Sequence, residues 1–175
     1  SLVLISLNQA NPNLAKPQVW KAVKLALDYD GMQKNIVQGS CLCGAVRYEA
    51  GPDFRAMVHC HCQRCRKGSG TAHSTNLVVE PGNFRWLSGT ELLSRFDLPV
   101  AKSFGKWFCL QCGSPVPRLF RGGTLVMIPA GSLDVEPPIK PTDHIFWSSR
   151  PGWGCQSGDL QTHEEYPASW GQAPA

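Results

Sequence analysis

The chain has 175 residues, 42% of them hydrophobic and 17% charged, which is enough apolar material for one packed domain and excludes wholesale disorder. Its 17 glycines and 14 prolines favour short strands joined by turns over long helices. The net charge of +4 gives no indication of a nucleic-acid partner, since no Lys/Arg run exceeds two residues.

Residues 1–38 contain no cysteine and are predicted to form a helical N-terminal extension. From Pro17, a favoured first helical position, the segment VWKAVKLALDYDG has the pattern of an amphipathic helix with one apolar stripe. The extension also resembles an internal piece of periplasmic solute-binding proteins of the oligopeptide class. We transfer no function from that match, because a peptide-binding cleft needs two whole lobes. A gene fusion, an engineered graft and a chance match all remain open.

From Gly39 onward the pattern changes to short, often alternating segments separated by Gly, Pro or Cys, which predicts an antiparallel β-domain. We expect this domain to cover residues 39–167, to become irregular from Pro137, and to be followed by a disordered tail at 168–175. The expected strands are residues 45–50, 73–79, 84–89, 91–98, 102–109, 114–120 and 124–131.

The apolar start SLVLISL lacks a basic leader and a cleavage site, and it is too short to span a membrane. We therefore expect a cytoplasmic protein with no membrane partner. Eight cysteines in such a chain indicate metal binding or catalysis rather than disulfides.

Two outer cysteine pairs predict a structural zinc site. Cys109 and Cys112 form a C-x-x-C knuckle, in which two thiolates reach one ion around a tight turn. Cys41 and Cys43 form C-x-C, which on a strand places both side chains on one face. Together they supply the four ligands of tetrahedral zinc and leave no position for a substrate. The alternative is a set of buried free thiols.

The central stretch HCHCQRC supplies three further cysteines, Cys60, Cys62 and Cys65. Three protein ligands and one exchangeable position are typical of catalytic zinc. A fourth protein ligand would instead close the site. On a strand, histidines that alternate with the cysteines would face away from the metal. The residues that could supply a fourth ligand are Cys155, His59, His61 and His144.

A basic run, Arg64, Arg66 and Lys67, surrounds the third of these cysteines. Arginine binds planar carboxylates through two parallel hydrogen bonds, so this run is a candidate anchor for an acidic substrate. Neutralising the charge of the neighbouring thiolates is the other interpretation.

Several motifs occur in an order and spacing that resembles a known family: GSCLCGAVRYEA, CHCQRCRKGSG, FRWLSG, FCLQCGSPV, IPAGSLD, HIFWSSRPGW and EEYP. Over residues 39–167 the chain is similar to the glutathione-dependent formaldehyde-activating enzymes, whose zinc-binding domain is shared with centromere protein V. The resemblance implies a mainly-β, Mss4-like (β-tent) fold. It also implies two zinc ions per chain: a structural ion on Cys41, Cys43, Cys109 and Cys112, and a catalytic ion on Cys60, Cys62 and Cys65.

The implied activity is that of a carbon–sulfur lyase, which joins formaldehyde to glutathione as S-hydroxymethylglutathione. The expected partners are glutathione or another small thiol, together with a small aldehyde. Three thiolate ligands make zinc a poor Lewis acid, which favours exchange of thiols over activation of water. The alternative is a non-catalytic zinc-stapled domain that binds a thiol or a protein. The candidate substrate-binding residues are Arg64, Arg66, Lys67, His73 and Trp153, and His73 and His144 are candidate proton donors.

Overall fold

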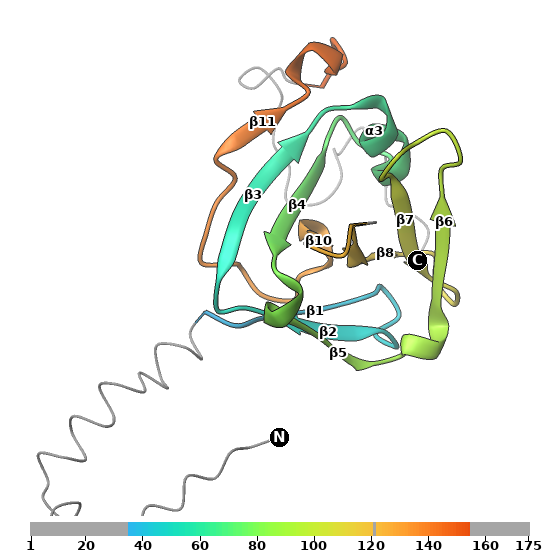
Figure 1. The fold of residues 1–175 in the computed structure, drawn as a ribbon, viewed down its shortest axis with the longest axis vertical. Helices are drawn as coiled ribbons and strands as arrows, with labels where there is room; N and C mark the ends of the chain where they lie inside the picture. The colour runs from blue at the N-terminus through green and yellow to red at the C-terminus, as the bar shows by residue number, and fades with distance from the viewer. Residues whose placement is uncertain (1–34, 121, 155–175) are drawn as a thin grey trace, which may run out of the picture.

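The computed structural model describes residues 35–120 and 122–154. The expected helix after Pro17, the tail at 168–175 and Cys155 lie outside the described residues. Within them the fold is mainly β, with three sheets and one short α-helix, which confirms the predicted fold class (Figure 1).

The first sheet, here the basal sheet, has the order β1–β2–β5 and is antiparallel. Its strands are β1 (Val37–Ser40), β2 (Arg47–Ala50) and β5 (Phe84–Ser88). β1 begins two residues before the expected domain start at Gly39, and its pairing with β2 makes Val37 part of the domain. In Figure 1 this sheet lies across the bottom of the molecule.

The second sheet, here the large sheet, has the order β11–β3–β4–β10–β9. All its pairs are antiparallel except β11 with β3, where His144 lies opposite His59. Its strands are β3 (Phe54–Cys60), β4 (Ser74–Val79), β9 (Arg118–Leu119), β10 (Val126–Pro129) and β11 (Asp143–Ile145).

The third sheet, here the small sheet, has the order β6–β7–β8, and Figure 1 shows its strands β6 and β7 on the side of the molecule opposite β3. Its strands are β6 (Leu93–Asp97), β7 (Gly105–Cys109) and β8 (Pro115–Val116). Helix α3 (Gln63–Ser69) lies between β3 and β4 in sequence and at the top of the figure. Short 3-10 turns complete the chain: η1 (Pro81–Asn83), η2 (Thr90–Leu92), η3 (Ala130–Ser132) and η4 (Trp147–Ser149).

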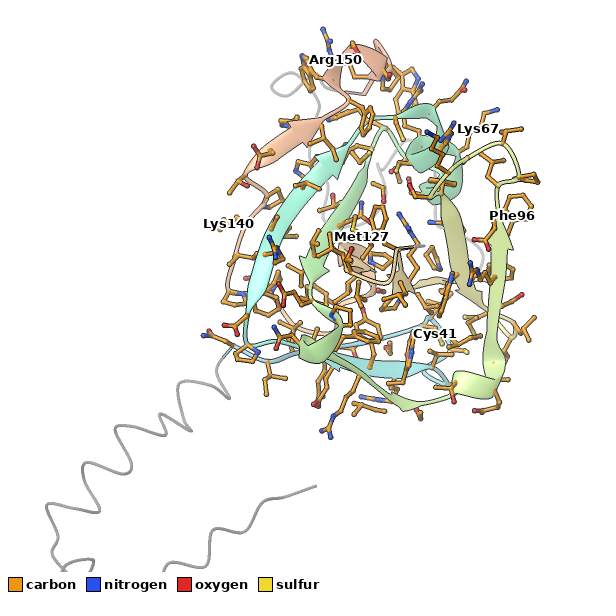
Figure 2. The ribbon with its side chains drawn as sticks, viewed as in Figure 1. Cys41, Lys67, Phe96, Met127, Lys140 and Arg150 are labelled. Atoms are coloured by element: carbon orange, nitrogen blue, oxygen red, sulfur yellow. The ribbon has the colours of Figure 1, made fainter. Side chains whose placement is uncertain are left out.

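The main core lies where the basal and large sheets face each other. Tyr48, Leu77 and Ile128 are fully buried there, because alternate residues of their strands point to the same side. The Tyr48 hydroxyl lies 3.0 Å from the Ser132 carbonyl oxygen, to which it donates, so its buried polar end is paired. Figure 2 shows the side chains filling the space between the sheets, with Lys67 and Lys140 at the periphery.

Candidate functional site

Four cysteines meet where the basal and small sheets approach each other. Cys41 follows β1 and Cys109 ends β7, and both are buried. The sulfur atoms of the set all lie within 4.8 Å of one another, with Cys43 Sγ 3.4 Å from Cys41 Sγ and 3.9 Å from Cys109 Sγ. This four-cysteine cluster consists of Cys41, Cys43, Cys109 and Cys112.

Two similar turns build the cluster. The amides of Gly44 and Gly113 each donate to the carbonyl oxygen three or four residues earlier, at 2.8 Å. Both glycines have positive φ, 74° and 72°, a conformation that favours glycine. Backbone amides are directed at the sulfurs: the Val46 amide lies 3.3 Å from Cys41 Sγ, and the Ser114 amide is the main reason that the pKa of Cys112 falls to about 6.

Three further cysteines meet at the top of the large sheet. Cys60 is the last residue of β3, Cys62 is the N-cap of α3, and Cys65 lies in the first turn of that helix. The Cys65 amide donates to Cys62 Sγ at 3.4 Å, which closes the helix start around the sulfur. The three sulfurs lie within 4.8 Å of one another and form the three-cysteine cluster.

The electrostatics of this cluster favour ionisation of one thiol first. A hydrogen bond from Cys65 and the Cys62 amide lower the pKa of Cys60 to about 6, against the effect of burial. The same hydrogen bond and burial raise the pKa of Cys65. The surroundings therefore favour ionisation of Cys60 over that of Cys65.

The donor sets of both clusters fit a thiophilic metal ion such as zinc. Four sulfurs complete a tetrahedral shell, whereas three leave one position for another ligand. His59, His61 and His144 do not join the three sulfurs within ligand distance in the described part of the chain.

Two cations from distant strands approach the three-cysteine cluster. Burial lowers the pKa of Arg118, on β9, and that of Lys106, on β7, while the electrostatic interaction of each cation with Cys65 acts in the opposite direction. The Arg118 guanidinium also lies 4.9 Å from the centre of the Phe120 ring. Lys106 crosses helix α3 at Gly68, where an added Cβ would lie 3.0 Å from the lysine Cδ.

The three residues of the basic run, which the sequence indicated as a candidate anchor, differ in their exposure. Arg64 and Lys67 are exposed on α3, and Arg66 is half-buried with no hydrogen-bond partner for its Nε. Sequence reasoning missed Lys106 and Arg118, because only the pairing of β7 and β9 into their sheets brings them to the sulfurs. Trp153 is 73% exposed.

Histidines gather beside the three-cysteine cluster. His61 is fully buried, and its Nε2 lies 2.9 Å from Nδ1 of His144. The ring centres of His59 and His73 are 4.4 Å apart, and the Trp147 ring packs edge-on against His61. Burial, and then the neighbouring imidazoles, lower the pKa of His59 and His61, so both are neutral near pH 7.

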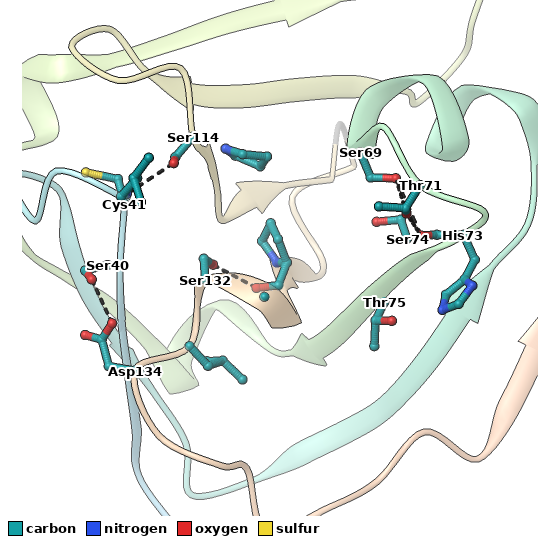
Figure 3. A pocket seen from close by; sticks show the side chains of 15 residues that line it. Ser40, Cys41, Ser69, Thr71, His73, Ser74, Thr75, Ser114, Ser132 and Asp134 are labelled. Atoms are coloured by element: carbon teal, nitrogen blue, oxygen red, sulfur yellow. Dashed lines mark hydrogen bonds between the residues drawn. The ribbon is translucent and has the colours of Figure 1, made fainter. Parts of the chain in front are cut away.

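A cavity of about 750 Å³ lies between the two clusters (Figure 3). Cys41 lines one end, and Ser69 and His73 line the other. Ser69 donates a hydrogen bond of 2.9 Å to the carbonyl oxygen of Cys65, and Ser74, another lining residue, lies directly opposite Cys60 in the β3–β4 pairing. Cys60, Cys62 and Cys65 do not line the cavity themselves, and the cavity approaches the three-cysteine cluster through these neighbouring residues.

A mainly-β domain with two cysteine clusters, each of which could hold a metal ion, is typical of small metal-binding proteins. Comparison with known proteins identifies its family. Residues 36–149 match the model of the glutathione-dependent formaldehyde-activating enzyme family, and the chain belongs to that family.

A curated relative from Halomonas elongata carries the same family name provisionally. It is 28% identical over 126 residues, which cover 67% of this chain and 79% of the relative. A solved Rhodobacter sphaeroides protein superposes with a TM-score of 0.47 and 24% identity, covering 58% of this chain and 91% of that one. In the described ranges, no helix has the length and apolarity needed to cross a membrane.

Proposed function

We propose that the protein is a zinc-dependent enzyme of the carbon–sulfur lyase type, which joins a small thiol to a small aldehyde. The family name supplies glutathione and formaldehyde as the first pair to test. The observation that carries the proposal is a cluster of three sulfurs, one short of a closed tetrahedral shell, beside a cavity large enough for a tripeptide-sized thiol.

We assign a structural zinc to the four-cysteine cluster and a catalytic zinc to Cys60, Cys62 and Cys65. Zinc bound there supplies one exchangeable position that favours the thiolate form of an incoming thiol. The three cysteine thiolates weaken its Lewis acidity, so the site suits ligand exchange better than water activation. Arg118 and Lys106 offset the negative charge of the sulfurs from the side of β9 and β7.

The chain's own residues orient and protonate the reactants. The substrate thiolate adds to the carbonyl carbon of the aldehyde, which places negative charge on the carbonyl oxygen. His73 lines the cavity and its Nδ1 is buried without a partner, so we assign to His73 the transfer of a proton to that oxygen. This completes the hydroxymethyl thioether without any change in oxidation state.

The test is exchange between free and thiol-bound formaldehyde, followed by NMR with trace amounts of zinc-loaded protein. The expected result is faster exchange at an unchanged equilibrium position, and loss of that acceleration in Cys60→Ser. Lys140→Gln, a change at an exposed position on the periphery (Figure 2), is the control and should keep full activity. No acceleration by the wild-type protein with any thiol would contradict the proposal and leave a zinc-stapled domain that binds thiols or proteins.

A further inference from the structure

Hydroxyl groups from distant parts of the chain converge on the cavity between the two clusters. They come from Ser40 at the end of the basal strand β1, from Ser69 and Thr71 at the end of α3, and from Ser132 in η3 (Figure 3). Pro115 and Leu133 supply apolar surface between them. A wall of this kind, with apolar faces and scattered oxygens, is suited to a ligand that is polar but not ionic.

Most of these hydroxyls have already used their single hydrogen inside the protein. Ser40 Oγ donates to Asp134 Oδ1 at 2.7 Å, and Ser132 Oγ donates to the Pro129 carbonyl oxygen at 2.7 Å. Ser69 Oγ donates to the Cys65 carbonyl oxygen at 2.9 Å, and Thr71 donates to the carbonyl oxygen of His73. What these groups have left for a ligand is oxygen lone pairs, so the wall accepts hydrogen bonds and has few to give.

The charge on the cavity wall also favours hydrogen-bond donors over carboxylates. Asp134 lines the cavity and its carboxylate is an acceptor only. Its salt-bridge partner Arg47 lies 3.9 Å away and is half exposed, so the ion pair leaves much of the negative charge uncompensated. A ligand carboxylate placed here would meet a like charge and a surface of lone pairs, whereas a hydroxyl or an ammonium would find acceptors.

We infer that the thiol used at this site has a hydroxylated body without carboxylates, such as a sugar thiol, and that glutathione, with two carboxylates, is a poorer ligand. The inference rests on the proposed function for the role of the sulfur. The cavity selects the remaining part of the thiol ligand. The hydroxyl groups of the ligand donate to Ser40, Ser132 and Asp134, and its carbon faces pack on Pro115 and Leu133.

Binding can be measured apart from catalysis with thioethers, which cannot exchange. The probes are methyl 1-thio-β-D-glucopyranoside and S-methylglutathione, titrated into the zinc-loaded full chain by calorimetry. The expected result is a dissociation constant about tenfold lower for the thioglucoside. Equal affinities, or tighter binding of S-methylglutathione, would overturn the inference.

Gly131 offers a way to reverse the preference without disturbing the fold. It lines the cavity, has no positive φ, and an added Cβ would meet nothing within 4 Å. Gly131→Lys places an ammonium at the wall and should tighten S-methylglutathione about tenfold relative to Gly131→Gln, which has a long side chain without the charge. No difference between these two variants would count against the cavity as the binding site.

Gly82→Lys is the control for net charge. It adds the same cation at η1, where an added Cβ also meets nothing within 4 Å, and should leave both affinities unchanged. If it tightened S-methylglutathione as much as Gly131→Lys does, the effect would be one of overall charge and the inference would fail.

The thioether titrations separate this inference from the proposed function. Formaldehyde exchange together with preferred binding of S-methylglutathione would overturn the inference and leave the enzyme activity standing. Preferred binding of the thioglucoside without exchange for either thiol would support the cavity's specificity and contradict the lyase activity.

Discussion

Single residues from across the fold balance the charge of the three-cysteine cluster. Arg118 and Lys106 lie on strands of two different sheets, and both interact electrostatically with Cys65. Because these cations are largely shielded from water, their interaction with the sulfurs is screened less than that of the exposed Arg64 and Lys67.

Arg118→Met should therefore weaken metal binding at the three-cysteine cluster by about tenfold, because three thiolates then share the site with one cation fewer. The measurement is transfer of zinc from the protein to a chromophoric chelator. Lys67→Met, which removes a cation from the exposed face of α3, should change the transfer little. Equal effects of the two substitutions would show that Arg118 acts only through net charge.

His61 makes stability depend on pH. Burial lowers its pKa in the folded protein below the ordinary value of about 6.5. As the pH falls through about 6.5, the unfolded chain takes up a proton that the folded chain refuses, so stability decreases until the lowered pKa is reached. Urea unfolding with excess zinc should show a smaller loss between about pH 7.5 and 5.5 for His61→Gln than for the wild type. An identical loss would remove His61 as the cause.

The grouping of the cysteines into two clusters was predictable and the charged neighbours of these clusters were not. Cys109 and Cys112, or Cys62 and Cys65, are brought together by one turn, so their spacing carries the geometry. Lys106 reaches the sulfurs only because β7 takes its place in the small sheet, and nothing near Lys106 in the sequence indicates this.

The stability of helix α3 depends mainly on the residues at its two ends. Its seven residues are too few for a stable isolated helix. It is held by the sulfur of Cys62 at the start and by Gly70, with φ of 72°, at the end. This helix was not predicted because its residues were interpreted as metal ligands and a basic run, and about two turns are too few to show an apolar period. β3 was missed for the same reason, since its last residue is Cys60.

Gly70→Ala should destabilise the protein by about 1 kcal/mol, because alanine pays to adopt the left-handed conformation that closes the helix. An added Cβ at Gly70 meets nothing within 4 Å, so the cost is one of backbone conformation only. Chemical denaturation measures it. Gly82→Ala, which has the same free space without a positive φ, should be close to neutral.

For the whole molecule, the two clusters hold different parts together. The four-cysteine cluster connects the turn between β1 and β2 with the turn between β7 and β8, and so ties the basal sheet to the small sheet. The three-cysteine cluster lies within one stretch of chain at the start of α3. Removal of a metal ion from the four-cysteine cluster should therefore destabilise the fold more than removal from the three-cysteine cluster.

Graded chelation should release metal in two steps, the first with β structure retained and the second with its loss. Circular dichroism and a zinc indicator recorded together measure this. Cys60→Ser should fold with one ion, whereas Cys109→Ser should fail to fold stably. A single step, or the same behaviour of both variants, would contradict the division of the cysteines.

The order in which the chain is synthesised adds a consequence. Cys41 and Cys43 leave the ribosome long before Cys109 and Cys112, so no ion can be held by all four until most of the domain exists. β10 and β11 follow Cys112 in the sequence, yet they pair with the earlier strands β4 and β3. Metal capture during translation would thus close the basal sheet on the small sheet first, and the large sheet would be completed around a framework already fixed by the ion.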